Sequence, residues 1–80
     1  MELNPHEQEL AVHLAQSLDD MKSLLTYERF VKRFSESFLK EILHTVLKMP
    51  KEKIRNSRGA YFTFLVGQRS HSQKYYDTRN

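Results

Sequence analysis

Cations, short polar side chains and a glycine lie together in one stretch of the sequence, residues 51–62. The stretch precedes and begins a predicted helix, which Asn56 or Ser57 would cap. A helix start of this kind suits phosphate, because backbone N–H groups and the positive end of the dipole face the anion while arginine donates bidentate hydrogen bonds. Gly59 in the first turn would permit close backbone approach or tight helix packing. A capped helix start behind a solvated basic loop would leave the same pattern. The candidate nucleic-acid-binding residues in this stretch are Lys51, Lys53, Arg55, Asn56 and Arg58.

A second group of cations lies earlier in the chain. Arg29, Lys32 and Arg33 stand at i, i+3 and i+4, so they share one face of a helix. If that face lies beside residues 51–58, the two groups form one patch large enough for a few backbone phosphates. We therefore add Arg29 and Arg33 to the candidate nucleic-acid-binding residues. The alternative is an ordinary solvated helix face.

The charge of the chain is distributed unevenly. Residues 1–47 hold eight acids and five bases, whereas residues 48–80 hold eight bases and two acids. Such asymmetry indicates a polyanion-binding surface in the C-terminal part, although ordinary solubilising charge would look similar. Near the C-terminus, Tyr75 and Tyr76 lie between Lys74 and Arg79, where their rings could stack on single-stranded bases.

Residues for catalysis or metal binding are scarce. The chain has no Cys, which excludes disulfides, thiolate metal sites and a thiol nucleophile. His6, Glu9 and His13 stand at i, i+3 and i+7, but two turns separate the imidazoles and no fourth ligand is evident. Phosphate-binding loops, dinucleotide fingerprints and catalytic triads are absent from the sequence. We expect no enzyme, no cofactor, no metal and no small-molecule substrate.

Length and composition predict one small domain. Eighty residues with 39% hydrophobic content suit a single compact core. No apolar run approaches the roughly 18 residues that span a bilayer, and the N-terminus is polar and acidic, unlike a signal peptide. We expect a cytoplasmic protein that does not enter a membrane.

Apolar spacing predicts that the elements positioning these residues are helices. The first begins at Pro5, with Asn4 as N-cap and Glu7 completing a capping box. Asp19-Asp20 is a break or a second cap, so residues 5–25 form either one helix or a helix and a short turn. A second helix, capped by Thr26, follows. The apolar stripes of these helices comprise Leu10, Ala11, Leu14, Ala15 and Leu18, then Tyr27, Phe30, Val31 and Phe34.

Two more helices are expected in the second half. The third follows a Ser35–Ser37 cap region, carries a Glu36–Lys40 pair and ends at Met49-Pro50. The fourth runs through Val66, with Gly67 as its C-terminal stop. Residues 61–66 are strand-like in composition, but no second strand is available to pair with them. The prediction is therefore an all-α, compact bundle of three to four helices over residues 1–67, with a disordered basic tail over 68–80.

Residues 54–62, Ile-Arg-Asn-Ser-Arg-Gly-Ala-Tyr-Phe, resemble the closing helix of DnaD-like primosomal and plasmid replication-initiation modules. In those modules a basic connector and an Asn precede a helix with a Tyr-rich start, and the resemblance covers about residues 36–66. It implies a helical DNA-binding or helicase-loading module, with Arg55, Asn56, Arg58 and Tyr61 near the nucleic acid.

These observations favour a small nucleic-acid-binding accessory module that contacts phosphates through the basic connector and helix start. The alternative is a protein-interaction adaptor or homodimer, because seven aromatic residues between Tyr27 and Phe64 are many for so short a chain to bury.

Overall fold

The computed structural model describes the backbone of residues 2–54 and 56–79, and the side chains of residues 2–54 and 56–70. The described chain is all-α and contains no strand. Its elements are α1 (Pro5–Ser17), η1 (Met21–Ser23), α2 (Leu24–Arg33), α3 (Glu36–Lys48), η2 (Lys51–Lys53) and α4 (Arg58–Arg79), where η denotes a 3₁₀ turn.

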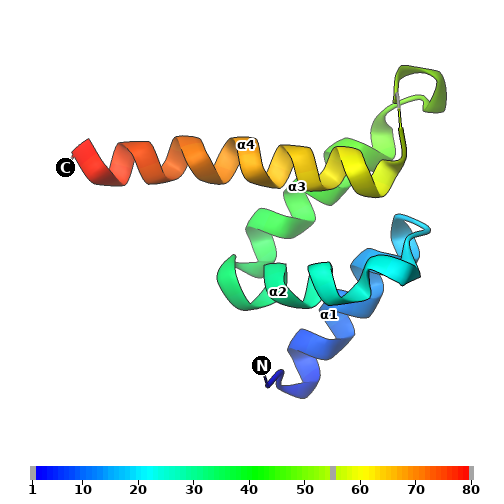
Figure 1. Ribbon diagram of the computed structural model, residues 1–80, viewed down its shortest axis with the longest axis horizontal. Coiled ribbons are helices and arrows are strands. Elements are labelled where there is room, and N and C mark those ends of the chain that lie inside the picture. The colour runs from blue at the N-terminus through cyan, green and yellow to red at the C-terminus, as the bar shows by residue number, and fades with distance from the viewer. Residues whose placement is uncertain (1, 55, 80) are drawn as a thin grey trace.

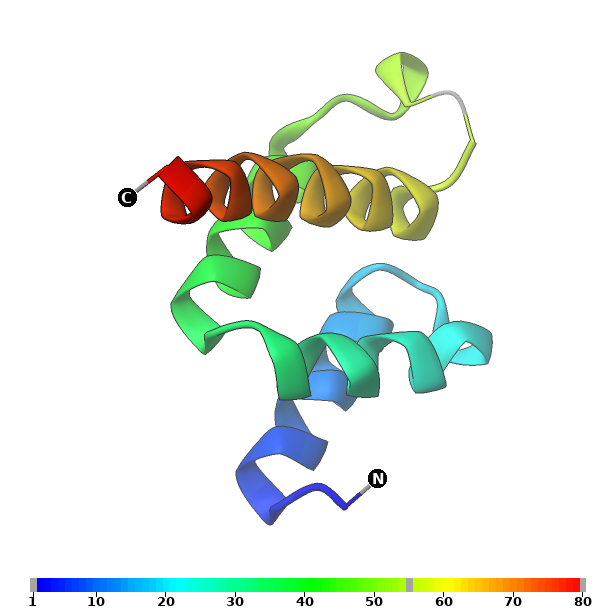
Figure 2. The same cartoon turned by 60° about the vertical axis from the view of Figure 1, so that its left-hand side comes forward.

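The helices are arranged as two pairs (Figure 1). α1 packs beside α2, and α3 packs beside α4, while α3 also contacts α2. Figure 2 shows the connector between α3 and α4 looping away from the rest of the fold. One hydrophobic core draws on all four helices, which confirms the predicted bundle.

Side-chain caps set the start of three helices. Asn4 and Glu7 form the predicted capping box of α1, and the Ser35 hydroxyl accepts a hydrogen bond from the Phe38 amide at the start of α3. At the start of α4, the Ser57 hydroxyl accepts a hydrogen bond from the Ala60 amide at 3.1 Å. The sequence allowed either Asn56 or Ser57 as this cap, and Ser57 fills the role.

Two predicted helix boundaries, the start of α2 and the end of α4, are wrong. Thr26 does not cap α2, because the helix already begins at Leu24. Its Leu24 amide bonds to the Met21 carbonyl of the preceding 3₁₀ turn, and this bond takes the place of a side-chain cap.

Gly67 does not end α4, whose bounds run to Arg79. Gly67 keeps a negative φ rather than the left-handed conformation that would stop the helix. The tail predicted over residues 68–80 falls mainly on residues 71–80, whose side chains lie outside the described part of the structure.

The chain leaves α1 through a left-handed turn at Asp19, where φ is 54°. The Asp20 amide bonds to the Ala15 carbonyl at 2.8 Å and the Asp19 amide to the Gln16 carbonyl at 3.1 Å. These two bonds are those of a Schellman motif, with Asp19 in the position that glycine usually fills. The structure therefore has a helix and a short turn over residues 5–25, the second of the two alternatives.

Residues 61–66 are helical, which decides the predicted ambiguity in favour of a helix. Phe62, Leu65 and Val66 point into the core at i, i+3 and i+4, and Phe62 is fully buried. Phe64 lies on the outer face of the same helix, with 58% of its surface exposed.

A hydrogen-bonded pair in the first half of the chain packs against the start of α4. The buried Tyr27 hydroxyl donates a hydrogen bond to Asp20 Oδ2 at 2.7 Å. Burial and then this carboxylate raise the pKa of Tyr27 well above its usual value, so the phenol stays protonated. Gly59 packs directly on the pair: a Cβ there would overlap the Asp20 carboxylate and lie 2.7 Å from the Tyr27 hydroxyl. The tight packing predicted for Gly59 is therefore confirmed.

The two glycines of α4 should respond oppositely to alanine. Gly59→Ala should lower the free energy of unfolding by about 1–3 kcal/mol, since its methyl group has no room beside Asp20 and Tyr27. Gly67→Ala should raise it by roughly 0.5–1 kcal/mol, because nothing lies within 4 Å and alanine favours the helix. Urea denaturation followed by circular dichroism measures both. Equal effects at the two positions would contradict the tight contact at Gly59.

Candidate nucleic-acid interface

Most of the predicted connector residues surround the start of α4. Lys51 and Lys53 are exposed in η2, Asn56 is exposed, and Arg58 is half-buried as the first residue of α4. Arg55 lies outside the described residues. We call the set Lys51, Lys53, Asn56, Ser57 and Arg58 the α4-start surface.

The first turn of α4 carries a cation and no acid of its own. The cation is Arg58, which lies at the positive end of the helix dipole. The Nε atom of Arg58 is buried and has no hydrogen-bond partner among the described residues. Lys51, Lys53 and Arg58 also form no ion pair with any described acid. Lys51 and Lys53, which are exposed, are therefore accessible to an external anion, whereas Arg58 is only partly so.

Two hollows adjoin the α4-start surface and share Ile54, Asn56 and Ser57. The first, which we call the Asp19 hollow, is lined by Leu18, Asp19, Lys51, Ile54, Asn56, Ser57 and Arg58. The second, the Phe64 hollow, is lined by Lys53, Ile54, Asn56, Ser57, Ala60, Tyr61 and Phe64. Only the first has a carboxylate in its lining.

Acids from the turn after α1 lie close to this surface. Asp19 is exposed in the Asp19 hollow, and the Asp20 carboxylate packs against Gly59 in the first turn of α4. Glu52 stands between the two lysines in η2. The sequence indicated only a helix break at Asp19 and Asp20, since their proximity to α4 depends on tertiary packing. Asp20 thus provides the negative charge that the first turn of α4 lacks.

Two aromatic rings extend the surface along α4. The rings of Tyr61 and Phe64 are stacked, with centroids 6.4 Å apart and planes inclined by 18°. Phe64 is exposed, whereas Tyr61 is half-buried and packs against the core. The two residues stand three apart, which makes them neighbours on a helix, and this spacing was the available sequence signal for the pair. The DnaD-like resemblance placed Tyr61 near the nucleic acid, and Tyr61 and Phe64 were otherwise expected only among the seven aromatic residues that would favour a protein-interaction surface.

The cations of α2 do not join the α4-start surface. α2 and α4 begin near each other, but the C-terminal end of α2, with Lys32 and Arg33, lies at the far end from the connector (Figure 1). Lys32 Nζ is 3.2 Å from Glu7 Oε1, and the Arg33 guanidinium lies 5.7 Å from the centroid of the Phe34 ring. Arg29 is exposed and lines neither hollow. The single patch that would have included Arg29 and Arg33 is therefore not formed.

The remaining aromatics mostly serve the core. Tyr27 and Phe62 are fully buried and pack edge to face with centroids 5.9 Å apart. Phe30, Phe34 and Phe38 are half-buried and continue the row of ring contacts from this pair. Phe64 is the one aromatic with more than half of its surface exposed among the residues whose side chains are described. Tyr75 and Tyr76, proposed for base stacking, lie outside that range.

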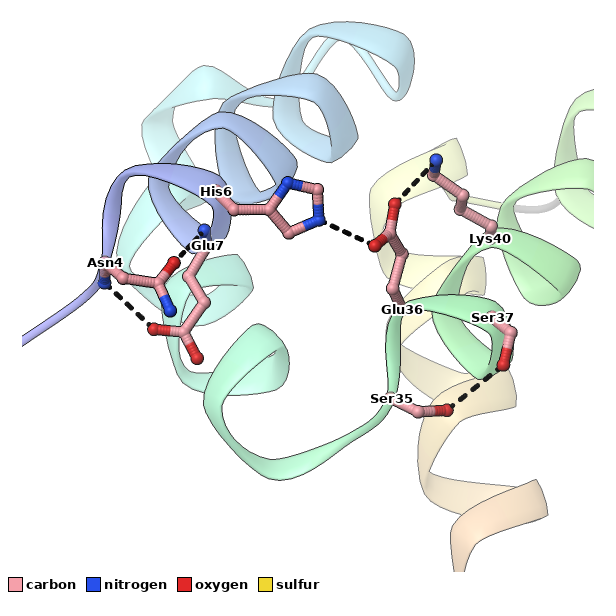
Figure 3. Close-up of polar contacts among 7 residues, drawn as sticks. All are labelled: Asn4, His6, Glu7, Ser35, Glu36, Ser37 and Lys40. Atoms are coloured by element: carbon pink, nitrogen blue, oxygen red, sulfur yellow. Dashed lines mark hydrogen bonds and ion pairs between the residues drawn. The ribbon is translucent and has the colours of Figure 1, made fainter.

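His6 at the start of α1 takes part in an ion-pair network (Figure 3). His6 Nε2 lies 2.6 Å from Glu36 Oε1, and Lys40 Nζ lies 2.7 Å from Glu36 Oε2, so the start of α1 is tied to the start of α3. The Glu36–Lys40 pair confirms the predicted one. Among the described residues, no group of three potential ligands is placed to hold a metal ion, His6, Glu9 and His13 included.

The Glu36 network gives stability a defined pH dependence. The hydrogen bond and charge of Glu36 raise the pKa of His6, whereas Lys40 and then His6 lower the pKa of Glu36 to about 2. The contribution of His6 to stability is complete below pH 6.5, its ordinary pKa, and is lost as the pH rises through the raised pKa of the folded state. The contribution of Glu36 to stability is complete above pH 4.5, its ordinary pKa, and is lost as the pH falls toward 2.

His6→Ala should therefore lower the thermal midpoint most between pH 4.5 and 6.5 and progressively less at alkaline pH. His13→Ala is the matched control, because His13 is exposed on the same helix and makes no ion pair within the described residues. Thermal scans at several pH values check this. A His6→Ala effect that grew with rising pH would contradict the network.

None of the helices in the described residues is long and apolar enough to cross a bilayer. Comparisons of the chain with models of protein families, with curated proteins and with solved structures found no match. The DnaD-like resemblance of residues 36–66 therefore stays a prediction, and the function is inferred from the geometry of the α4-start surface.

Proposed function

We propose that this chain is a non-enzymatic nucleic-acid-binding module and that the α4-start surface contacts backbone phosphates. The observation that carries the proposal is the grouping of Lys51, Lys53 and Arg58 around one helix start, with Asn56 and Ser57 as further polar contacts. Lysine, arginine, amide and hydroxyl side chains are the groups that position proteins on a phosphate backbone.

The proposal assigns the contacts to side chains rather than to the backbone of α4. Ser57 already accepts the Ala60 amide, and the Asp20 carboxylate lies against Gly59. A phosphate would therefore approach from the outer side, where Lys51 and Lys53 are exposed. Binding of this kind is electrostatic, depends on salt and gives little sequence selectivity.

Arg29, Lys32 and Arg33 have no part in this proposal, because they lie away from both hollows. They make a useful control instead. Removal of these three charges changes the net charge by the same amount as removal of Lys51, Lys53 and Arg58.

Protein binding is the second candidate function. Phe64 is 58% exposed, and Leu25 at the start of α2 is 57% exposed, so apolar surface is available on both halves of the fold. Sedimentation velocity at high concentration tests the homodimer form of this function, which requires a species heavier than the monomer.

The first test replaces charges. Lys51→Gln/Lys53→Gln/Arg58→Gln should weaken binding to a fluorescent oligonucleotide at low salt at least tenfold and flatten the dependence of log K on log salt by roughly 0.7–0.9 per lost phosphate contact. Arg29→Gln/Lys32→Gln/Arg33→Gln should change both far less. Anisotropy titrations at two or more salt concentrations measure this. Because Arg58 is half-buried, the Lys51→Gln/Lys53→Gln variant keeps the test valid if the triple variant unfolds.

Equal losses for the two triple variants would show that only net charge matters, and no binding at low salt would end the proposal.

Asp19→Asn tests the same surface in the opposite direction. The substitution removes the only carboxylate lining the Asp19 hollow, and asparagine tolerates the left-handed conformation at this position. Affinity for the oligonucleotide should rise a few-fold at low salt, and the gain should shrink as salt is added. Glu41→Gln on the exposed face of α3 removes one negative charge elsewhere and serves as the control. A weaker complex with Asp19→Asn would place the polyanion away from this hollow.

A further inference from the structure

We infer that the stacked rings of Tyr61 and Phe64 form a platform for bases, so that the nucleic acid bound at the α4-start surface is single-stranded. The inference rests on the proposed function and specifies its ligand. It concerns the Phe64 hollow, which adjoins the phosphate-binding cations but has a different chemical lining.

Phe64 is exposed, whereas its neighbours on the core-facing side of α4 are buried. Phe62, two residues earlier, is fully buried, and Leu65 and Val66 complete the core-facing stripe of α4. The only aromatic contact of Phe64 among the described residues is with Tyr61. A phenylalanine ring left 58% exposed on so small a domain contributes little to the core, and its apolar face remains available to another molecule.

The geometry of the two rings suits stacked bases. Their planes are inclined by only 18° and their centroids are 6.4 Å apart, so the two rings present similarly oriented faces next to each other. Aromatic side chains bind bases of any sequence in this way, because every base has a π face.

The charge of the hollow favours a polyanion over other occupants. Lys53, Asn56 and Ser57 line the hollow together with Tyr61 and Phe64, and no carboxylate lines it. A cation and polar groups beside an exposed ring and a half-buried ring can contact the backbone and the bases of a single strand together. A duplex would offer its phosphates, but its bases are already stacked and paired and cannot lie on the rings.

The test measures, by fluorescence anisotropy, the affinity of the wild-type chain and of Phe64 variants for dT12, rU12 and a mixed-sequence 12-base-pair duplex. The wild-type chain should bind a single strand more tightly than the duplex at equal salt. Phe64→Ala should weaken single-strand binding roughly 5- to 100-fold while leaving the salt slope and duplex binding unchanged. Phe64→Trp should retain the affinity, and its fluorescence should be quenched when the strand binds.

Two control variants separate stacking from apolar contact and from folding. Phe64→Leu keeps an apolar side chain without a π face, and the inference expects it to behave like Phe64→Ala. Leu25→Ala removes an equally exposed apolar side chain, 57% against 58%, from the start of α2, and it should leave binding unchanged. Because Phe64 is exposed, its variants should keep the thermal midpoint of the wild type within a few degrees.

The outcomes separate this inference from the proposed function. Salt-dependent binding that is lost with Lys51→Gln/Lys53→Gln but unaffected by Phe64→Ala overturns the platform and leaves the phosphate surface standing. No binding of any strand at low salt overturns both. Self-association that disappears with Phe64→Ala identifies a protein contact and overturns the platform. A preference for dT12 over rU12, or the reverse, that is lost with Phe64→Ala supports the platform and identifies which nucleic acid it takes.

Discussion

The hydrogen bond from the Tyr27 hydroxyl to the Asp20 carboxylate is the contact on which the position of the candidate interface depends. It joins the turn after α1 to α2, and Gly59 packs on both partners, so the start of α4 is held against the first half of the chain. Tyr27 is fully buried, so its hydroxyl needs an acceptor, and the half-buried Asp20 carboxylate provides it. Neither side chain leaves space for a side chain at residue 59. The α4-start surface takes its orientation from this contact.

The same contact decides what kind of binding surface the helix start can be. With the Asp20 carboxylate beside its first turn, α4 has an internal anion at its positive end. The helix dipole is partly neutralised there, so in the proposed function the attraction for a polyanion comes from the outer cations. Such a surface depends on flexible, exposed lysines, which bind a phosphate backbone as point charges and do not impose the bidentate geometry of arginine. It therefore suits a ligand whose shape is not fixed.

Most local features of the fold could be predicted from the sequence, whereas which surfaces meet in the folded chain mostly could not. The Asn4 capping box, the Ser35 cap and the Glu36–Lys40 pair each involve residues no more than four apart. The predicted cap at Thr26 was wrong because the preceding 3₁₀ turn provides the hydrogen bond that starts α2 at Leu24. For the interface, the sequence named Lys51, Lys53 and Arg58 but joined them to Arg33, since helical periodicity shows which residues share a face and not which faces meet.

The exposure of Phe64 shows what such periodicity can and cannot decide. In a segment as rich in apolar residues as 61–66, composition gave no reason to place Phe64 outside and Phe62 inside. Only once residue 62 is assigned to the core does the helical repeat put residue 64 on the outer face. The hydrophobic core of the described residues does not include Phe64, and a ring that is 58% exposed contributes little to it. The exposed face of Phe64 is therefore either apolar surface without a function or a contact for another molecule. The second alternative is favoured by Lys53, Asn56 and Ser57, which line the same hollow and suit a ligand that has both anionic and aromatic groups.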